Sequence, residues 1–256
     1  MEIPLQVERP AQSEHINMIL YGDSGSGKTH FLGTAQACKE TSPSIILDFE
    51  MGTRSLSGVE IDVVRPGSWK EIQDIYEYLR FDKRKYKSVS LDSVTEIQKK
   101  FSLGAILGDV EDGRVDLGQT VAPGIKDWLR TGDQMRKLIR AFRDLAYNAE
   151  KERRVHVFMT ALERINDKRQ IISPQLYGSL GEECGAIVDF LVRLSRETQM
   201  TTEGEEVVRR HLLTDDHINS DEVKVMGKNR GSLLPKGIWE PTVTKIMDLL
   251  KGAKNE

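Results

Sequence analysis

The chain has 256 residues, enough to bury a substantial core without disulfides or metals. Charged residues make up 30 % and hydrophobic residues 38 %, a balance typical of a globular protein and not of a disordered or membrane-spanning one. The net charge of −3 excludes a protein that is basic overall, although a local basic stripe could still bind nucleic acid.

Targeting and cysteine signals are weak. No apolar run approaches the length of a bilayer span, and the first residues lack a basic-then-apolar signal peptide. Cys38 and Cys184 lie far apart, and no spaced Cys/His cluster suggests zinc. We therefore expect reduced core thiols and a cytoplasmic protein with no membrane partner.

In chain order, we expect residues 1–15 to form a lead-in and residues 16–256 a single domain. An apolar run over 16–21 predicts a buried strand, and 31–38 can form a helix. Between them lies an octapeptide that fits the pattern G-x-x-x-x-G-K-[ST]: Gly22, Asp23, Ser24, Gly25, Ser26, Gly27, Lys28 and Thr29. A preceding strand and a following helix are the context that this motif requires.

The octapeptide predicts a phosphate-binding loop. Its glycines let successive backbone N–H groups approach phosphate oxygens, and the start of the helix adds partial positive charge. Lys28 would reach the β- and γ-phosphates, and the Thr29 hydroxyl would bind Mg²⁺. A glycine-rich turn that matches by chance is the alternative. The expected ligands are ATP and Mg²⁺.

The remaining elements alternate at first and then cluster as strands. Strands are predicted at 44–50, 59–64, 86–92 and 155–160, and a helix follows a capping box at Ser68 and Glu71. Another helix passes through 135–146, with loops at 107–124 and 163–181. Strands at 188–196 and 207–213 form a predicted hairpin, followed by a strand at 222–226 and a helix at 242–250. This order predicts an α/β fold with a mainly parallel sheet flanked by helices and extended by C-terminal antiparallel strands.

Polar residues at strand ends are candidates for the chemistry. Asp92 ends an apolar strand, where the carboxyl ends of parallel strands converge, so it is the candidate metal-side acid; it could also cap the helix that begins at Ser93. Glu50 is the candidate that orients the attacking water, against the alternative of a solvated acid. Asp48 competes with Glu50 for this role, and spacing alone does not decide between them. Thr160 could sense the γ-phosphate or be an ordinary strand-end threonine.

Lys228 and Arg230 follow the predicted strand at 222–226. At positions i and i+2 of an extended segment, both side chains point to the same side. They could neutralise charge on a neighbouring subunit's nucleotide, as an arginine finger does. The alternative is a solvated basic turn.

Three segments resemble RecA-type proteins. Residues 46–50 resemble the segment that carries the catalytic glutamate, residues 89–94 resemble the Walker B strand, and residues 227–230 are similar to the late Lys-x-Lys or Lys-x-Arg element. Overall, residues 16–250 look most like the compact phage-type RecA-like ATPases associated with single-strand annealing and recombination. Ser93 stands where AAA+ motors usually carry a glutamate, which favours the RecA-like reading.

This resemblance implies a RecA-like core that hydrolyses ATP as a homo-oligomer, a ring or a filament, on single-stranded DNA. It also implies a single-strand binding protein as a candidate partner and, for a phage protein, the cytoplasm of a bacterial host. Two departures limit the resemblance: Thr160 and the two residues after it replace the usual glutamine element, and we expect the extra terminal domains of full recombinases to be absent.

The resemblance places nucleic acid at two loops. The first, 108–126, is acidic on balance. The second carries cations that can bind phosphates and a tyrosine that can stack on a base, namely Arg164, Lys168, Arg169 and Tyr177. An ordinary solvated loop is the alternative for these residues.

Two other functions use the same phosphate loop. One is a nucleotide-dependent loader or adaptor that binds ATP and turns it over slowly. The other is a small-molecule kinase, which the absence of an evident Arg-rich lid disfavours.

Overall fold

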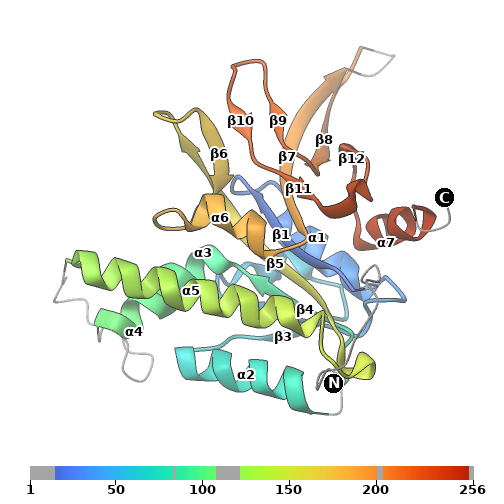
Figure 1. The fold of residues 1–256 in the computed structure, drawn as a ribbon. Coiled ribbons are helices and arrows are strands. Elements are labelled where there is room, and N and C mark those ends of the chain that lie inside the picture. Colours follow the sequence, from blue (N-terminus) through green and yellow to red (C-terminus); the bar gives the residue numbers. More distant parts are fainter. Residues whose placement is uncertain (1–14, 83–84, 108–121, 201–203, 254–256) are drawn as a thin grey trace, which may run out of the picture.

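A computed structural model describes residues 15–82, 85–107, 122–200 and 204–253. Its centre is a mixed sheet with the strand order β12-β8-β7-β1-β5-β4-β2-β3 (Figure 1). The strands of this path are β1 (Asn17–Gly22), β2 (Ser44–Asp48), β3 (Asp62–Val64), β4 (Ser88–Asp92), β5 (His156–Asn166), β7 (Phe190–Met200), β8 (Glu206–Leu213) and β12 (Gly237–Trp239).

The central strands are parallel, and β5 lies between β1 and β4. Asn17 to Gly22 pair with Val157 to Leu162, while Ser88 to Leu91 pair with His156 to Met159. Every residue of β1 and of β4 is buried, as expected for parallel strands covered on both faces. The carboxyl ends of β1 and β4 therefore lie on either side of the middle of β5, at Thr160 to Leu162.

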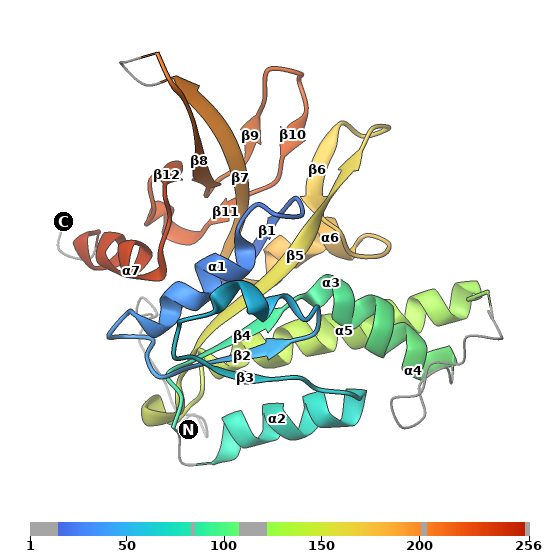
Figure 2. The same cartoon turned by 180° about the vertical axis from the view of Figure 1, so that it is seen from behind.

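Helices cover both faces, and the two views show one face each (Figures 1 and 2). One core packs the sheet against α2 (Trp69–Phe81), α3 (Val94–Glu96), α5 (Ile125–Leu145) and α6 (Leu180–Ile187). The other packs it against α1 (Lys28–Gly33) and α7 (Val243–Gly252). A π-helix at Ile97–Ser102 and α4 (Leu103–Leu107) follow α3. The expected α/β fold with C-terminal antiparallel strands is confirmed.

The prediction of a loop at 163–181 is wrong. β5 continues to Asn166 and turns back as β6 (Ile171–Pro174), and α6 begins at Leu180. β6 then pairs with β10 (Lys224–Val225), which itself pairs with β9 (His217–Ile218). The polar sequence of this segment did not indicate a hairpin. Its small sheet is completed only by β10, a strand more than 50 residues later in the chain.

Other predicted elements differ mainly in length. The Ser68 side chain caps α2 by accepting a hydrogen bond from the Glu71 backbone N–H, as predicted. The predicted hairpin is β7 and β8, paired from Arg193–Leu213 to Met200–Glu206, whereas the strand expected at 222–226 shrinks to β10. Most of the predicted loop at 107–124 lies outside the described residues.

Cys38 and Cys184 are buried free thiols. None of the helices described is both long and apolar enough to cross a bilayer.

His156 makes the sheet sensitive to acid. Its ring is 4 % exposed, its Nδ1 accepts a hydrogen bond from the Ile16 backbone N–H over 3.1 Å, and the His15 ring lies 4.7 Å away. Burial, and then the neighbouring His15, lower the pKa of His156 from 6.5 to about 3. The folded chain thus keeps this imidazole neutral at pH values where the unfolded chain protonates it.

We predict that this residue lowers the free energy of unfolding as the pH falls from 6.5 towards 3, by at most about 1.4 kcal/mol per pH unit. His156→Gln retains an acceptor for the Ile16 N–H and removes the titration, so its stability should fall less over that range. Urea unfolding between pH 4 and 7, with the exposed His217→Gln as control, measures the difference. An unchanged slope in His156→Gln would contradict the assignment.

Candidate nucleotide-binding site

Close backbone contacts shape the loop between β1 and α1. Gly25 and Gly27 adopt positive φ angles of 75° and 103°, which L side chains rarely adopt. A Cβ on Gly22 would lie 2.2 Å from the Leu194 carbonyl oxygen. The glycines are therefore required by this loop, and its exposed segment is formed by Asp23, Ser24 and Gly25.

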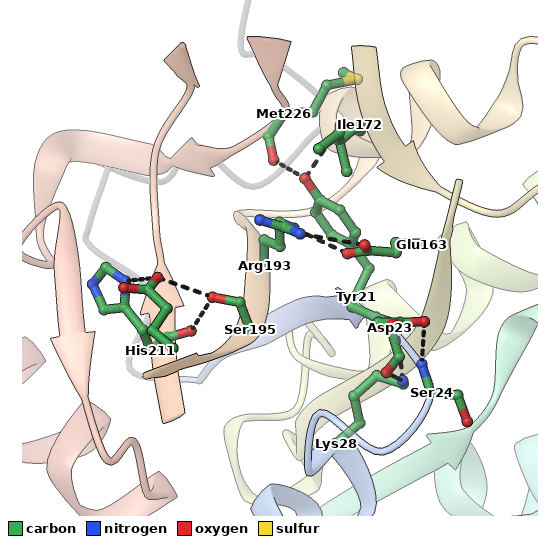
Figure 3. Close-up of polar contacts among 12 residues, drawn as sticks. Tyr21, Asp23, Ser24, Lys28, Glu163, Ile172, Arg193, Ser195, His211 and Met226 are labelled. Carbon is green, nitrogen blue, oxygen red and sulfur yellow. Dashed lines mark hydrogen bonds and ion pairs between the residues drawn. The ribbon is translucent and has the colours of Figure 1, made fainter. Parts of the chain in front are cut away.

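Lys28 lies beneath the loop. Its Nζ donates hydrogen bonds to the carbonyl oxygens of Gly22 at 2.9 Å and Asp23 at 2.8 Å (Figure 3). Burial lowers the pKa of Lys28, and the nearby carboxylates of Glu50 and Asp92 oppose that shift. The ammonium group is thus fixed by the loop and faces the acids of the neighbouring strands.

The Asp92 carboxylate connects three segments. Thr29 Oγ1 donates to its Oδ2 over 2.7 Å, and Thr160 Oγ1 donates to its Oδ1 over 2.5 Å. Burial raises the pKa of Asp92, the two threonine hydroxyls lower it, and the carboxylates of Glu50 and Asp48 raise it further. The sheet thus brings together the candidates Thr29, Asp92 and Thr160. Thr160 is fully buried and its hydroxyl is directed at Asp92.

The structure distinguishes Glu50 from its competitor Asp48. Asp48 is 1 % exposed and accepts hydrogen bonds from the backbone N–H of Gly52 at 3.1 Å and from Thr53 Oγ1 at 2.6 Å, so its carboxylate stabilises the turn that follows β2. Glu50 is exposed and accepts a hydrogen bond from Ser93 Oγ, next to Asp92. Glu50 is therefore the acid that is free to contact a ligand.

The donor set fits a magnesium ion bound together with a nucleotide. Thr29 and Asp92 present hydroxyl and carboxylate oxygens side by side, the type of ligand that Mg²⁺ prefers. Gly52 lies beside this pair, since a Cβ built on it would be 3.4 Å from Thr29 Oγ1 and 3.8 Å from Asp92 Oδ2. Among the described residues, no group of three or more His, Cys, Asp or Glu side chains could hold a metal alone. Phosphate and water oxygens would have to supply the other ligands, as is usual for Mg²⁺.

The structure does not bring Lys228 and Arg230 to this loop. β11 (Lys228–Asn229) pairs with β7 at Leu191 and Phe190, beside the beginning of β1. Lys228 Nζ donates to the carbonyl oxygens of Gly185 and Val188, each at 2.7 Å. Arg230 forms an ion pair with Asp189 at 2.7 Å, yet its side chain is 58 % exposed. Within one chain, both cations stabilise the junction between α6 and β7.

The candidate nucleic-acid residues divide into two groups. Arg164 and Tyr177 line a cavity of about 300 Å³ together with Lys99. The Tyr177 ring lies 4.2 Å from that of Trp128, and its backbone N–H donates to Gln98 Oε1. Arg169 instead binds Glu182 through one guanidinium nitrogen, at 2.9 and 2.8 Å, and Lys168 is exposed in the turn between β5 and β6.

Sequence analysis missed two residues at the loop. Arg196 and Arg210 lie opposite each other on β7 and β8, and Arg210 contacts the loop at Gly27. The register of the predicted hairpin could have shown that these two arginines are paired. It could not have shown that the pair lies beside the phosphate loop, because the hairpin and the loop are more than 160 residues apart in the sequence.

Comparison with known proteins identifies the family. The family model described as "AAA domain" matches residues 14–230, so the chain belongs to that family of P-loop ATPase domains. A solved structure titled "Structural and biochemical analysis of a prototypical ATPase from the type III secretion system of pathogenic bacteria" is similar at 16 % identity and a TM-score of 0.42, covering 70 % of this chain and 52 % of that one. The chain thus spans about half the length of that protein. A search of the curated proteins found no match.

Proposed function

We propose that this chain is a Mg²⁺-dependent ATPase. The observation that carries the proposal is the convergence of Thr29, Asp92 and Glu50 beside the loop and Lys28. The loop and Lys28 would bind the β- and γ-phosphates, and Thr29 and Asp92 would hold Mg²⁺. When bound, the metal neutralises charge on the phosphate oxygens.

In this proposal, Glu50 orients the attacking water. Its carboxylate is exposed, and Ser93 Oγ donates to one of its oxygens, leaving the other available as an acceptor. Water would attack the γ-phosphorus in line with the bond to the β-phosphate oxygen, which leaves with ADP. Thr160 would act indirectly by positioning Asp92. A loader or adaptor with slow turnover is the alternative, because it would need the loop and the metal site but not Glu50.

We further propose that the ATPase is a RecA-like homo-oligomer in which Lys228 and Arg230 face a neighbour's nucleotide. Support comes from their position: they contact β7 about four residues before the level of the loop, roughly 13 Å along a strand, so they do not serve their own loop. The exposed part of Arg230 would be available to a second chain.

The proposed ligand of the assembly is single-stranded DNA, as in recombination or annealing. Arg164 and Lys99 flank the half-buried Tyr177, a combination suited to phosphates and one stacked base. This cavity is connected to the nucleotide site, since Thr95 and Gln98, which follow Asp92, form hydrogen bonds to the Gln175 carbonyl and the Tyr177 N–H. In this proposal, a change at Asp92 is transmitted to Tyr177 through α3 and the π-helix that follows it.

We predict that Glu50→Gln lowers ATP turnover by about 10²- to 10⁴-fold and leaves Mg·ATP affinity within about twofold of the original, because it removes the acceptor for the water and no phosphate contact. Phosphate release and calorimetric titration measure the two effects. Glu60→Gln, an exposed acid ten residues later, is the matched control. Equal turnover in both variants would favour the adaptor.

We predict that Arg230→Ala lowers the turnover of the assembled protein by about 10³-fold or more, while a dilute single chain binds ATP as before. Turnover measured against protein concentration, with the exposed Arg140→Ala as control, tests this. A variant whose assembly turns over ATP at the original rate would refute the role across the subunit boundary.

We predict that Tyr177→Ala weakens binding of a labelled oligo(dT) at least severalfold, since stacking of one base contributes about 1–3 kcal/mol. Fluorescence anisotropy with Mg²⁺ and a non-hydrolysable ATP analogue is the measurement, and Tyr78→Ala on the exposed face of α2 is the control. If neither the original chain nor Tyr177→Ala binds the oligonucleotide, the single-stranded DNA proposal fails.

A further inference from the structure

Two arginines of the β7–β8 hairpin face the phosphate loop of their own chain. Arg196 and Arg210 are direct cross-strand partners. Two residues away, on the same face, Leu194 and Leu212 are buried in the core that includes Phe31 and Leu32 of α1. This face of the hairpin therefore follows α1 to its beginning, and the arginines occupy the part that lies over the loop.

Three contacts place the hairpin against the loop. A Cβ on Gly27 would lie 2.4 Å from Arg210 Nε and 3.0 Å from its Cδ. A Cβ on Gly25 would lie 3.8 Å from an Nη of Arg196, and one on Gly22 would collide with the Leu194 carbonyl oxygen. Gly22 and Gly27 thus also make room for this hairpin.

The two guanidinium groups carry more positive charge than their neighbours offset, since Arg210 has one long ion pair and Arg196 has none among the described residues. Like charges directly opposite on two strands repel each other. Arg210 Nε is buried and has no hydrogen-bond partner within the described chain, although its Nη1 forms a long ion pair of 3.8 Å with Glu240. No ion pair of Arg196 occurs among the described residues. By contrast, the nearby Arg193 binds Glu163 through two hydrogen bonds of 2.9 and 3.2 Å (Figure 3).

Space for a ligand exists on this side of the loop. A polar cavity of about 420 Å³ lies between the loop and the hairpin, lined by Asp23, Ser24 and Ser26 on one side and by Arg193, Ser195 and Arg196 on the other. Figure 3 shows Asp23 and Ser24 of this lining beside Lys28. The Ser26 hydroxyl, 2 % exposed, also has no hydrogen-bond partner among the described residues.

We propose that Arg196 and Arg210 bind phosphate oxygens of the nucleotide held by the same chain's loop. This inference rests on the proposed ATPase function and adds a second set of cations, distinct from Lys228 and Arg230, which would serve a neighbour. A guanidinium group matches phosphate geometry and keeps its charge at any physiological pH. Bound phosphate would relieve the repulsion between the two arginines, so nucleotide occupancy would stabilise the hairpin against the loop.

The test compares Arg196→Ala and Arg210→Ala with Arg209→Ala, a neighbouring arginine on the opposite face of β8. Calorimetric titration with Mg·ATP should show affinity about tenfold or more weaker in the first two and unchanged in Arg209→Ala. Arg196 is exposed, so its replacement tests the proposal even if Arg210→Ala fails to fold. ATP affinity within twofold of the original in Arg196→Ala and every folded Arg210 variant would overturn the proposal.

Mixing variants tests whether the arginines act within one chain. A mixture of the Arg210→Ala and Lys28→Ala variants should not recover ATP turnover, because each chain then lacks either Arg210 or Lys28 at its own loop. Recovery would show that the arginine acts on a neighbour and would overturn the same-chain assignment. If the unaltered chain does not bind ATP, the proposed function itself fails and this inference with it. If it binds ATP and the arginine variants bind equally well, only this inference fails.

Discussion

The buried carboxylate of Asp92 is the point on which the site depends. A buried charge is tolerated only when it is hydrogen-bonded, and Asp92 obtains its donors from Thr29 at the loop and Thr160 on β5. Both donors are within reach because β5 lies between β1 and β4, and Thr160 in the middle of β5 follows Met159, the partner of Leu91. The strand order and the position of the loop are therefore both needed to satisfy this one buried side chain.

Charge around this carboxylate is unevenly distributed. Asp48, Glu50 and Asp92 approach the loop from two adjacent strands, and burial together with its acidic neighbours raises the pKa of Asp92. Asp48 is neutralised locally by hydrogen bonds and by Arg65, 3.5 Å away. The remaining two acids lie near Lys28, and their carboxylates oppose the lowering of its pKa by burial. The same arrangement leaves Glu50 as the exposed acceptor.

β7 links the two sets of cations that the proposals assign to nucleotide. Near its beginning it pairs with β11, and Lys228 and Arg230 bind the carbonyl and carboxylate oxygens around the end of α6. Further along, it carries Arg196 opposite Arg210 over the loop. β7 thus carries Arg196 beside its own loop, and near its beginning it pairs with β11, which brings Lys228 and Arg230 to the end of α6.

By itself, the sequence determined the phosphate loop, the alternation of helices and strands and the acids at strand ends, because these depend on residue spacing within short segments. It predicted the β7–β8 hairpin but not β6, whose polar strand is stable only against β10. It could not choose between Asp48 and Glu50, since neighbouring residues differ only in what surrounds them. Only the tertiary structure showed that Asp48 is buried and hydrogen-bonded to its own turn while Glu50 is exposed, and only it brought Arg196 and Arg210 to Gly25 and Gly27, because contacts between distant segments depend on strand order and register.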